Sequence, residues 1–276
     1  MFSGTRKQGY NGDGQLAINA QLSCPYGLFV TEDEQVLIAD THNHCVRKID
    51  RNGMISNIAE ITNNETLDYP SSVFQYKNET YIADTGNHRI VKMDQNGIIS
   101  KIATVRNNYP NFIGGIPFSI FVHNDELYFT DGNQLLHKTP IARSENIQTL
   151  AGIENEKGFN GHDMLATKCA LQFPMGIFVD DDSQIYIADK ENHCIRRIDR
   201  NGMITTIVGT GEEGYSGDIL FDFKQYPHIG PRKKKPLIKP FPHAFFDIII
   251  YCDNDFNNKD RKLKKEETSL NYHQND

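Results

Sequence analysis

One run of about twenty residues occurs three times in this 276-residue chain. The copies read LIADTHNHCVRKIDRNGMIS from residue 37, YIADTGNHRIVKMDQNGIIS from residue 81 and YIADKENHCIRRIDRNGMIT from residue 186. A fainter copy contains Asp131, so the leading aspartates Asp40, Asp84, Asp131 and Asp189 are separated by 44, 47 and 58 residues. A period of this length, with short alternating strands and Gly or Asn turns, is typical of a β-propeller blade.

Each unit divides into four short strands, which the first copy places at 27–31, 35–40, 45–50 and 54–60. The first strand is nearly all apolar, as expected of an innermost strand that neighbouring blades cover on both faces. The third strand alternates, with Arg47 and Lys48 among apolar residues, and is predicted to be partly exposed. A proline opens each unit, where the missing N–H costs no ladder bond. The units span about 25–61, 70–104, 115–151 and 174–208.

Asn-Gly pairs separate the third and fourth strands of three units: Asn52 with Gly53, Asn96 with Gly97, and Asn201 with Gly202. Asn-Gly is the strongest two-residue hairpin signal, because both residues tolerate positive φ. We therefore expect structural turns at these three places. A second repeat, GYNGDGQLAINAQLSCP at 9–25 and GFNGHDMLATKCALQFP at 158–174, aligns without a gap and joins the units.

The Asp-x-x-Asn-His signature followed by a hydrophobic/basic strand resembles the NHL repeat, and the GYNGDG connector is also typical of that family. The resemblance covers residues 4 to 218 or so, and the matching positions are Asp40, Asn43, His44, Asp84, Asn87, His88, Asp189, Asn192 and His193. The fourth unit keeps Asp131 but lacks the Asn-His pair. In this family such repeats build β-propellers, commonly of six blades, that mostly bind proteins or RNA; a minority of related propellers are enzymes.

We therefore expect an all-β, NHL-type propeller of about four complete four-stranded blades, plus a partial one at 4–24. The repeats occupy residues 1–218, and residues 219–276 form a non-repeat tail that is predicted to be partly disordered. Four blades are fewer than the six of the family's common ring. Either the tail closes or caps the array, or the arc is open and exposes unpaired edges that another chain could seal.

The bulk composition bounds the function classes. A formal net charge of -7 argues against phosphate-driven nucleic-acid binding as the main role. No signal peptide and no apolar run long enough to span a bilayer is seen, and the five cysteines form no CxxC pair, so we expect a cytoplasmic protein.

The pair of His42 and His44 beside Cys45 could suggest a soft metal site. The alternative is a structural turn, because each histidine follows a strand end where Asp and Asn side chains bond turn amides. No nucleophile elbow, phosphate-binding glycine loop or HExxH helix is present. We expect no catalytic residue, no metal ligand and no cofactor, although an axial ion would leave no linear motif.

A basic run in the tail comprises Arg232, Lys233, Lys234 and Lys235. Such a run can contact nucleic acid, anionic lipid or an import receptor, or it can be a solvated linker.

The resulting hypothesis is a non-catalytic scaffold that binds a protein partner through loops at one rim of the propeller. The most variable loops are 63–67, 107–114 and 139–146, and scaffolds carry specificity on loops. Two alternatives remain: a propeller enzyme of lyase or hydrolase type with an axial metal ion, and an RNA-binding propeller.

Overall fold

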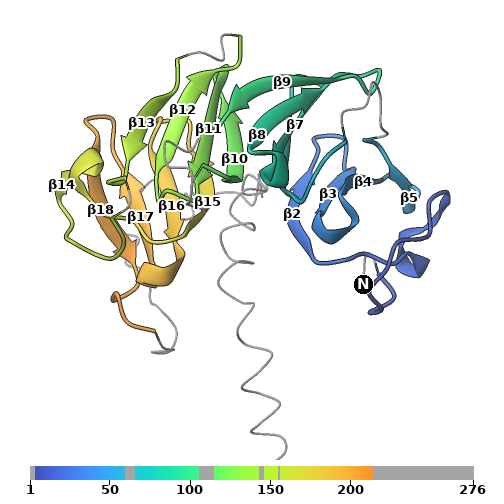
Figure 1. Cartoon of the computed structure of the whole chain (residues 1–276), viewed down its shortest axis with the longest axis horizontal. Coiled ribbons are helices and arrows are strands. Elements are labelled where there is room, and N and C mark those ends of the chain that lie inside the picture. The colour runs from blue at the N-terminus through green and yellow to red at the C-terminus, as the bar shows by residue number, and fades with distance from the viewer. Residues whose placement is uncertain (1–3, 60–65, 106–114, 143–145, 155, 214–276) are drawn as a thin grey trace, which may run out of the picture.

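The computed structural model describes residues 4–59, 66–105, 115–142, 146–154 and 156–213. Four antiparallel sheets follow one another along this part of the chain and stand next to each other in an arc (Figure 1). The expectation of an all-β propeller with four complete blades is confirmed. The basic run at 232–235, the tail and the loop 107–114 lie outside the described residues, as do parts of the other two variable loops.

Each blade is a four-stranded meander. Blade 1 contains β2 (Pro25–Val30), β3 (Val36–Asp40), β4 (Cys45–Ile49) and β5 (Met54–Asn57). Blade 2 contains β6 (Pro70–Tyr76), β7 (Glu79–Asp84), β8 (Arg89–Met93) and β9 (Ile99–Thr104). Blade 3 contains β10 (Pro117–His123), β11 (Glu126–Asp131), β12 (Leu136–Pro140) and β13 (Gln148–Ala151). Blade 4 contains β15 (Pro174–Val179), β16 (Ile185–Asp189), β17 (Cys194–Ile198) and β18 (Met203–Val208).

The two long connectors add a fifth strand to the outer edge of the blade that follows them. In blade 1 the pairing strand is β1 (Gln15–Leu16), which lies against β5 and leads into the 3-10 turn η1 (Ala17–Asn19). In blade 4 the pairing strand is β14 (Met164–Leu165), which lies against β18 and leads into η4 (Ala166–Lys168). The repeated connector therefore wraps from the outer edge of a blade back to its innermost strand.

The innermost strands differ in burial along the arc. All six residues of β15, the innermost strand of the last described blade, are buried. In contrast, β2 is exposed at Pro25 and Tyr26 and only partly covered beyond Gly27. Full coverage of the first unit's inner strand was therefore a wrong expectation, because no described blade precedes blade 1.

The Asn-Gly turns exist but have a different geometry from the one expected. Gly53 has φ 76°, and its N–H donates to the carbonyl of Asp50 at 2.9 Å. Asn52, in contrast, does not have a positive φ. The carboxylate of Asp50 accepts from the N–H of Asn52 and from that of Met54. The loop is thus a type I turn closed by a left-handed glycine, which is the three-residue hairpin rather than the two-residue one. The same pattern recurs at Gly97 and Gly202.

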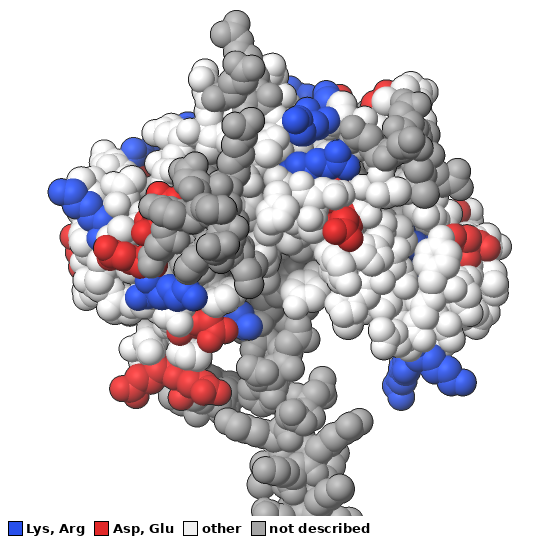
Figure 2. All heavy atoms as spheres, viewed as in Figure 1, with Lys and Arg blue, Asp and Glu red and all other residues white. Residues whose placement is uncertain are grey.

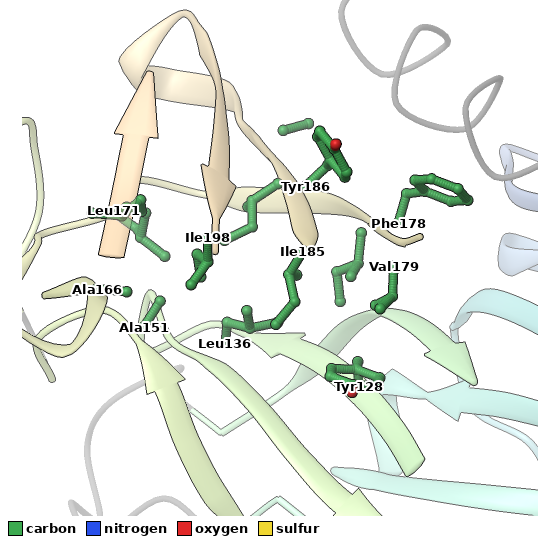
Figure 3. Packing of buried hydrophobic residues seen from close by; sticks show 14 of the residues in the cluster. Tyr128, Leu136, Ala151, Ala166, Leu171, Phe178, Val179, Ile185, Tyr186 and Ile198 are labelled. Atoms are coloured by element: carbon green, nitrogen blue, oxygen red, sulfur yellow. The ribbon is translucent and has the colours of Figure 1, made fainter. Parts of the chain in front are cut away.

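Three of the hydrophobic clusters lie between neighbouring blades, and a smaller one lies between blade 1 and its connector. Figure 3 shows the last seam, where Leu136 and Ala151 of blade 3 face Ala166 of the connector and Ile185 of blade 4. Nearer the innermost strands, one phenylalanine from each blade forms a ladder of rings: Phe29, Phe74, Phe121 and Phe178. Successive ring centroids are 4.5, 4.8 and 5.5 Å apart, within the range of favourable aromatic pairs. Each blade is therefore stabilised mainly by its neighbours.

Candidate binding rim

The repeated Asp-x-x-Asn-His motif lies at one rim of the arc, which we call the motif rim. This rim comprises the starts of the innermost strands and the turns after the second strands, namely η2 (Thr41–Asn43), η3 (Thr85–Asn87), the turn at 132–135 and η5 (Lys190–Asn192). The motif histidines His44, His88 and His193 end the three 3-10 turns with φ of 54°, 53° and 50°. Histidine is among the few residues other than glycine that are enriched in this left-handed conformation.

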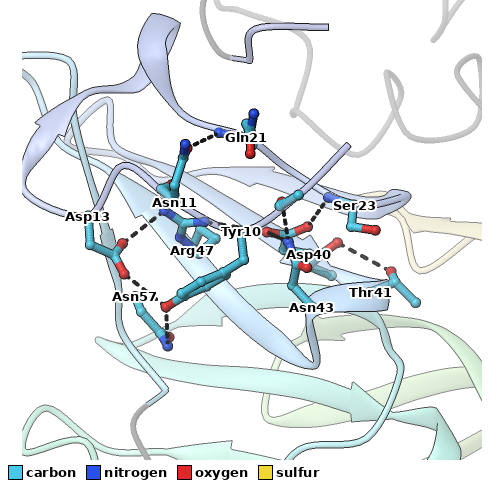
Figure 4. Close-up of polar contacts among 12 residues, drawn as sticks. Tyr10, Asn11, Asp13, Gln21, Ser23, Asp40, Thr41, Asn43, Arg47 and Asn57 are labelled. Atoms are coloured by element: carbon cyan, nitrogen blue, oxygen red, sulfur yellow. Dashed lines mark hydrogen bonds and ion pairs between the residues drawn. The ribbon is translucent and has the colours of Figure 1, made fainter. Parts of the chain in front are cut away.

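The motif aspartate joins two segments that are far apart in the sequence (Figure 4). One carboxylate oxygen of Asp40 accepts from the N–H of Ser23 at 2.7 Å, and the other accepts from Nδ2 of Asn43 at 2.9 Å. Nδ2 of Asn43 also donates to the carbonyl of Gly9 at 2.8 Å. Asp40 and Asn43 therefore fasten the connector to the blade, whereas we had expected such side chains to bond amides of their own turn.

The same arrangement recurs in two other blades. Asp84 accepts from the N–H of Asp68 at 2.7 Å and from Asn87 at 2.9 Å. Asp189 accepts from the N–H of Gln172 at 2.7 Å and from Asn192 at 2.8 Å. In each blade the amide donor lies two residues before the proline that opens the innermost strand. The motif thus sets where that strand begins.

Asp131 of blade 3 does bond its own turn. It accepts from the N–H of Asn133 at 3.0 Å and from that of Leu135 at 3.1 Å, and His137 Nε2 lies 3.3 Å from its second oxygen. The lost Asn-His pair is therefore replaced by a local Asp turn with a buried histidine behind it.

The third strand of the first unit was predicted to be partly exposed, but Arg47 is fully buried. Its Nη2 donates to Asp13 at 2.9 Å and to the carbonyl of Asn11 at 3.1 Å, while Nη1 lies 3.5 Å from Asp40. The guanidinium also stands 4.9 Å from the ring centre of Tyr10 (Figure 4). The connector covers this face of the sheet, and so the alternation in the sequence does not indicate exposure here.

Blade 4 repeats this buried arginine with Arg196. It bonds Asp189, the carbonyl of Gly161 at 2.7 Å and Sγ of Cys169 at 3.1 Å, below the ring of Phe159. Sequence reasoning missed the role of both arginines. A signal was available, because an arginine in the third strand and an aromatic residue in the connector occur together in these two units only.

Burial controls the electrostatics of the motif. It raises the pKa of Asp40 and of Asp189, although both carboxylates receive hydrogen bonds that oppose the shift. It also raises the pKa of the Cys45 thiol and of the Cys194 thiol to about 12. Since the thiolate is the nucleophile and the metal ligand, these two cysteines are suited to packing rather than to chemistry.

The first seam of the motif rim, between blades 1 and 2, exposes a cluster of rings. Tyr69 is 46% exposed, and its ring lies 4.4 Å from that of His44 and 5.5 Å from that of His42, edge to face in both cases. His44 Nδ1 lies 2.8 Å from a carboxylate oxygen of Asp68. Beneath them, the hydroxyl of Thr41 donates to the carbonyl of Pro70 at 2.8 Å, which ties the two blades together.

The last seam, between blades 3 and 4, repeats the exposed aromatic at Phe173, which is 37% exposed. Its N–H donates to the side-chain carbonyl of Gln134, and its ring lies 6.5 Å from that of Phe118. Nζ of Lys157 stands 5.7 Å from the ring centre. The motif rim therefore presents exposed aromatic rings on a framework whose polar residues are already paired.

Among the described residues, no group of three or more His, Cys, Asp or Glu side chains is placed to hold a metal ion. His42 and His44 instead contact Tyr69, and Cys45 is buried. Within the same residues, no helix has the length and apolar character needed to cross a bilayer.

Comparison with solved structures agrees with the fold. An auxiliary nutrient binding protein from Bacteroides thetaiotaomicron superimposes with a TM-score of 0.57 at 17% identity, covering 73% of this chain and 51% of that one. Virginiamycin B lyase from Staphylococcus aureus gives a TM-score of 0.47 at 18% identity over 66% of this chain and 55% of the lyase. The chain thus spans about half the length of these proteins. At 17% identity, the likeness to the nutrient binding protein shows the fold alone.

Sequence comparison is more specific. The Arabidopsis thaliana protein SUPPRESSOR OF QUENCHING 1, chloroplastic, is 35% identical over 63 residues, which are 22% of this chain and 6% of that protein. The Teneurin NHL domain matches residues 44–217, which include most of the described blades and more than half of the chain. The resemblance of the repeated motif to the NHL repeat is thereby confirmed, and the chain belongs to the Teneurin NHL domain family of β-propellers.

Proposed function

We propose that this propeller is a non-catalytic binding scaffold that holds a protein partner on the motif rim, around Tyr69 at the first seam. The observation that carries the proposal is that the polar and the aromatic side chains of this rim have different roles. The repeated Asp, Asn and Arg side chains are occupied by bonds within the framework, whereas the aromatic rings between the blades face solvent.

The chemistry of the first seam suits a protein surface. Tyrosine and histidine combine an apolar ring with a polar tip, and tyrosine is enriched at the centres of protein interfaces. The seam is also preorganised, since Thr41 and Asp68 tie the two blades that carry the rings. Ordering such a surface on binding costs little side-chain entropy.

RNA binding is less well supported. Single-stranded RNA needs stacking rings next to a continuous positive groove. Figure 2 shows Lys and Arg interspersed with Asp and Glu over the described residues of the face in view, without one large positive field. At the first seam the carboxylate of Asp68 lies against His44, whose ring contacts that of Tyr69, and a carboxylate at this place repels phosphate.

A site-specific photo-cross-linker tests the proposal. We place the photoreactive amino acid at Tyr69 and, in a matched control, at Ile147, which is also exposed but stands before the outermost strand of blade 3. Discrete protein adducts are expected at position 69 and not at 147, and they should withstand ribonuclease. Adducts that ribonuclease removes favour RNA, and equal labelling at both positions refutes a specific rim.

Metal analysis distinguishes the enzyme hypothesis from the scaffold hypothesis. The scaffold predicts that chelation leaves the position-69 adducts unchanged and that the purified chain holds no stoichiometric metal. A bound ion whose removal abolishes the adducts would contradict a metal-free binding rim.

A further inference from the structure

Two of the four blades accept a short extended segment on their outermost strand, and they do so in the same way. In blade 1 the N–H of Gly14 donates to the carbonyl of Ile55, and the N–H of Ala17 donates to that of Gly53, both at 2.8 Å. In blade 4, Asp163 and Ala166 donate to Ile204 and Gly202, again at 2.8 Å. In both blades, backbone carbonyl groups at the outer edge after an Asn-Gly turn therefore accept hydrogen bonds from an added strand.

The outer edge of blade 2 has the same acceptor groups. The sequence QNGIIS at 95–100 corresponds to RNGMIS at 51–56, so that Gly97 and Ile99 stand where Gly53 and Ile55 stand in blade 1. The turn is also the same, because the N–H of Asp94 donates to the carbonyl of Ile98 as that of Asp50 does to Met54. Alternation along the strand then turns the carbonyl of Ile99 outward, as it does for Ile55.

This edge is open in the part of the chain that the structure describes. Within it, β9 pairs with β8 alone. Ile98 is 51% exposed, whereas the corresponding Met54 and Met203 are half-buried. The sequence between β5 and β6 contains no counterpart of the Gly-aromatic-Asn-Gly connector that precedes blades 1 and 4.

We propose that the outer edge of β9 is a strand-addition site for an extended segment of a partner protein. Adding a strand satisfies edge groups that otherwise face water, and main-chain bonds then supply much of the affinity. This site is separate from the motif rim and does not depend on Tyr69. The partner could therefore occupy β9 without contacting the rings of the first seam.

The two filled edges define the chemistry of the segment. The long residues that pair, Leu16 and Leu165, are about half exposed, so that this position tolerates many side chains. The next residues, Ala17 and Ala166, are buried, and their N–H groups reach the glycine carbonyl. In blade 2, the position that corresponds to Ala17 lies beside Gly97. It is bounded by Ile99, which packs against the core that includes Met93. The segment must therefore carry a small residue three positions after the one whose N–H meets Ile99.

The probe is a synthetic peptide with the sequence of residues 11–20, NGDGQLAINA, added to the isotope-labelled full chain. We expect NMR shift changes at Gly97, Ile99 and Lys101, and amide exchange at Ile99 that is several-fold slower at saturating peptide. A second peptide with Phe at the position of Ala17 should leave these signals unchanged.

A matched pair of variants localises the effect. Ile99 corresponds to Ile55, which pairs with Gln15 of the connector, and its N–H faces the outward edge. Ile99→Pro removes that N–H and should abolish the shifts at Gly97 and Lys101, whereas Ile99→Val should retain them. Shifts confined to Ile55 of blade 1, equal response to both peptides, or no response at β9 would overturn the proposal.

Discussion

Replacing Arg47 by methionine tests whether the buried arginine holds the connector on blade 1. The change removes the donors to Asp13 and Asn11 and the cation above Tyr10, and it leaves the buried carboxylate of Asp40 without its nearest positive charge. Breaking a buried pair costs about 3 to 5 kcal/mol. Asp40 keeps the N–H of Ser23 and the amide of Asn43, which places the expected loss near the lower limit.

A loss of about 3 kcal/mol lowers the melting temperature of a domain of this size by roughly 6 to 12 °C. The penalty should also depend on pH. Burial already raises the pKa of Asp40 above its ordinary 3.8, and loss of Arg47 raises it further. A carboxyl with a raised folded-state pKa destabilises the fold above that pKa and costs nothing below the unfolded value. The deficit of Arg47→Met relative to wild type should therefore shrink as the pH falls toward 3.8.

The assay is urea unfolding of wild type, Arg47→Met, Asp40→Asn and the double variant from pH 3.5 to 7. The double variant should lose less than the sum of the single losses, because it leaves no buried charge unpaired. Lys48→Met, on the same strand and half-buried, is the control and should change stability by no more than about 0.5 kcal/mol. A pH-independent loss below about 1 kcal/mol for Arg47→Met would refute the reasoning.

Three further predictions concern the turns, the seams and the thiols. Gly53→Ala should cost about 1 kcal/mol by urea unfolding, since φ is 76° and only strain opposes the methyl group; an unchanged midpoint would contradict the turn assignment. Phe121→Ala removes the middle of the ring ladder and should cost about 3 to 5 kcal/mol, and a loss under 1 kcal/mol would show that the rings contribute little. Thiol labelling at pH 8 should modify exposed Cys24 rapidly and spare Cys45 and Cys194 until urea unfolds the chain; early labelling of either buried thiol would contradict its burial and raised pKa.

The four blades could be predicted from the sequence because their determinants are local. A proline and a leading aspartate mark two points of each strand meander, and an Asn-Gly step marks a third point in blades 1, 2 and 4. These signals can be recognised from residues within the same unit. In the first unit the strand bounds differ from expectation by at most three residues, and three of the eight coincide.

The roles of the polar residues could not be predicted from the same patterns. The partners of Arg47 lie in the connector 34 and 36 residues earlier, and the partner of Asp40 lies 17 residues earlier. An alternating pattern distinguishes the two faces of a strand, but it does not indicate which segment of the chain covers each face. The ring cluster at Tyr69 likewise forms only when two blades meet, since His44 and Tyr69 are 25 residues apart.

The ladder of phenylalanine rings makes the arc behave as a linear array with nearest-neighbour coupling. In such an array the free energy is a sum over blades and seams, and among the four described blades the first and the last have one such coupling each where an inner blade has two. Partial unfolding should then begin at blade 1, whose innermost strand is the least covered, and spread inward seam by seam. A ligand that bridges Tyr69 and His44 would add a second coupling at the first seam, and by mass action would suppress this fraying from the N-terminal end.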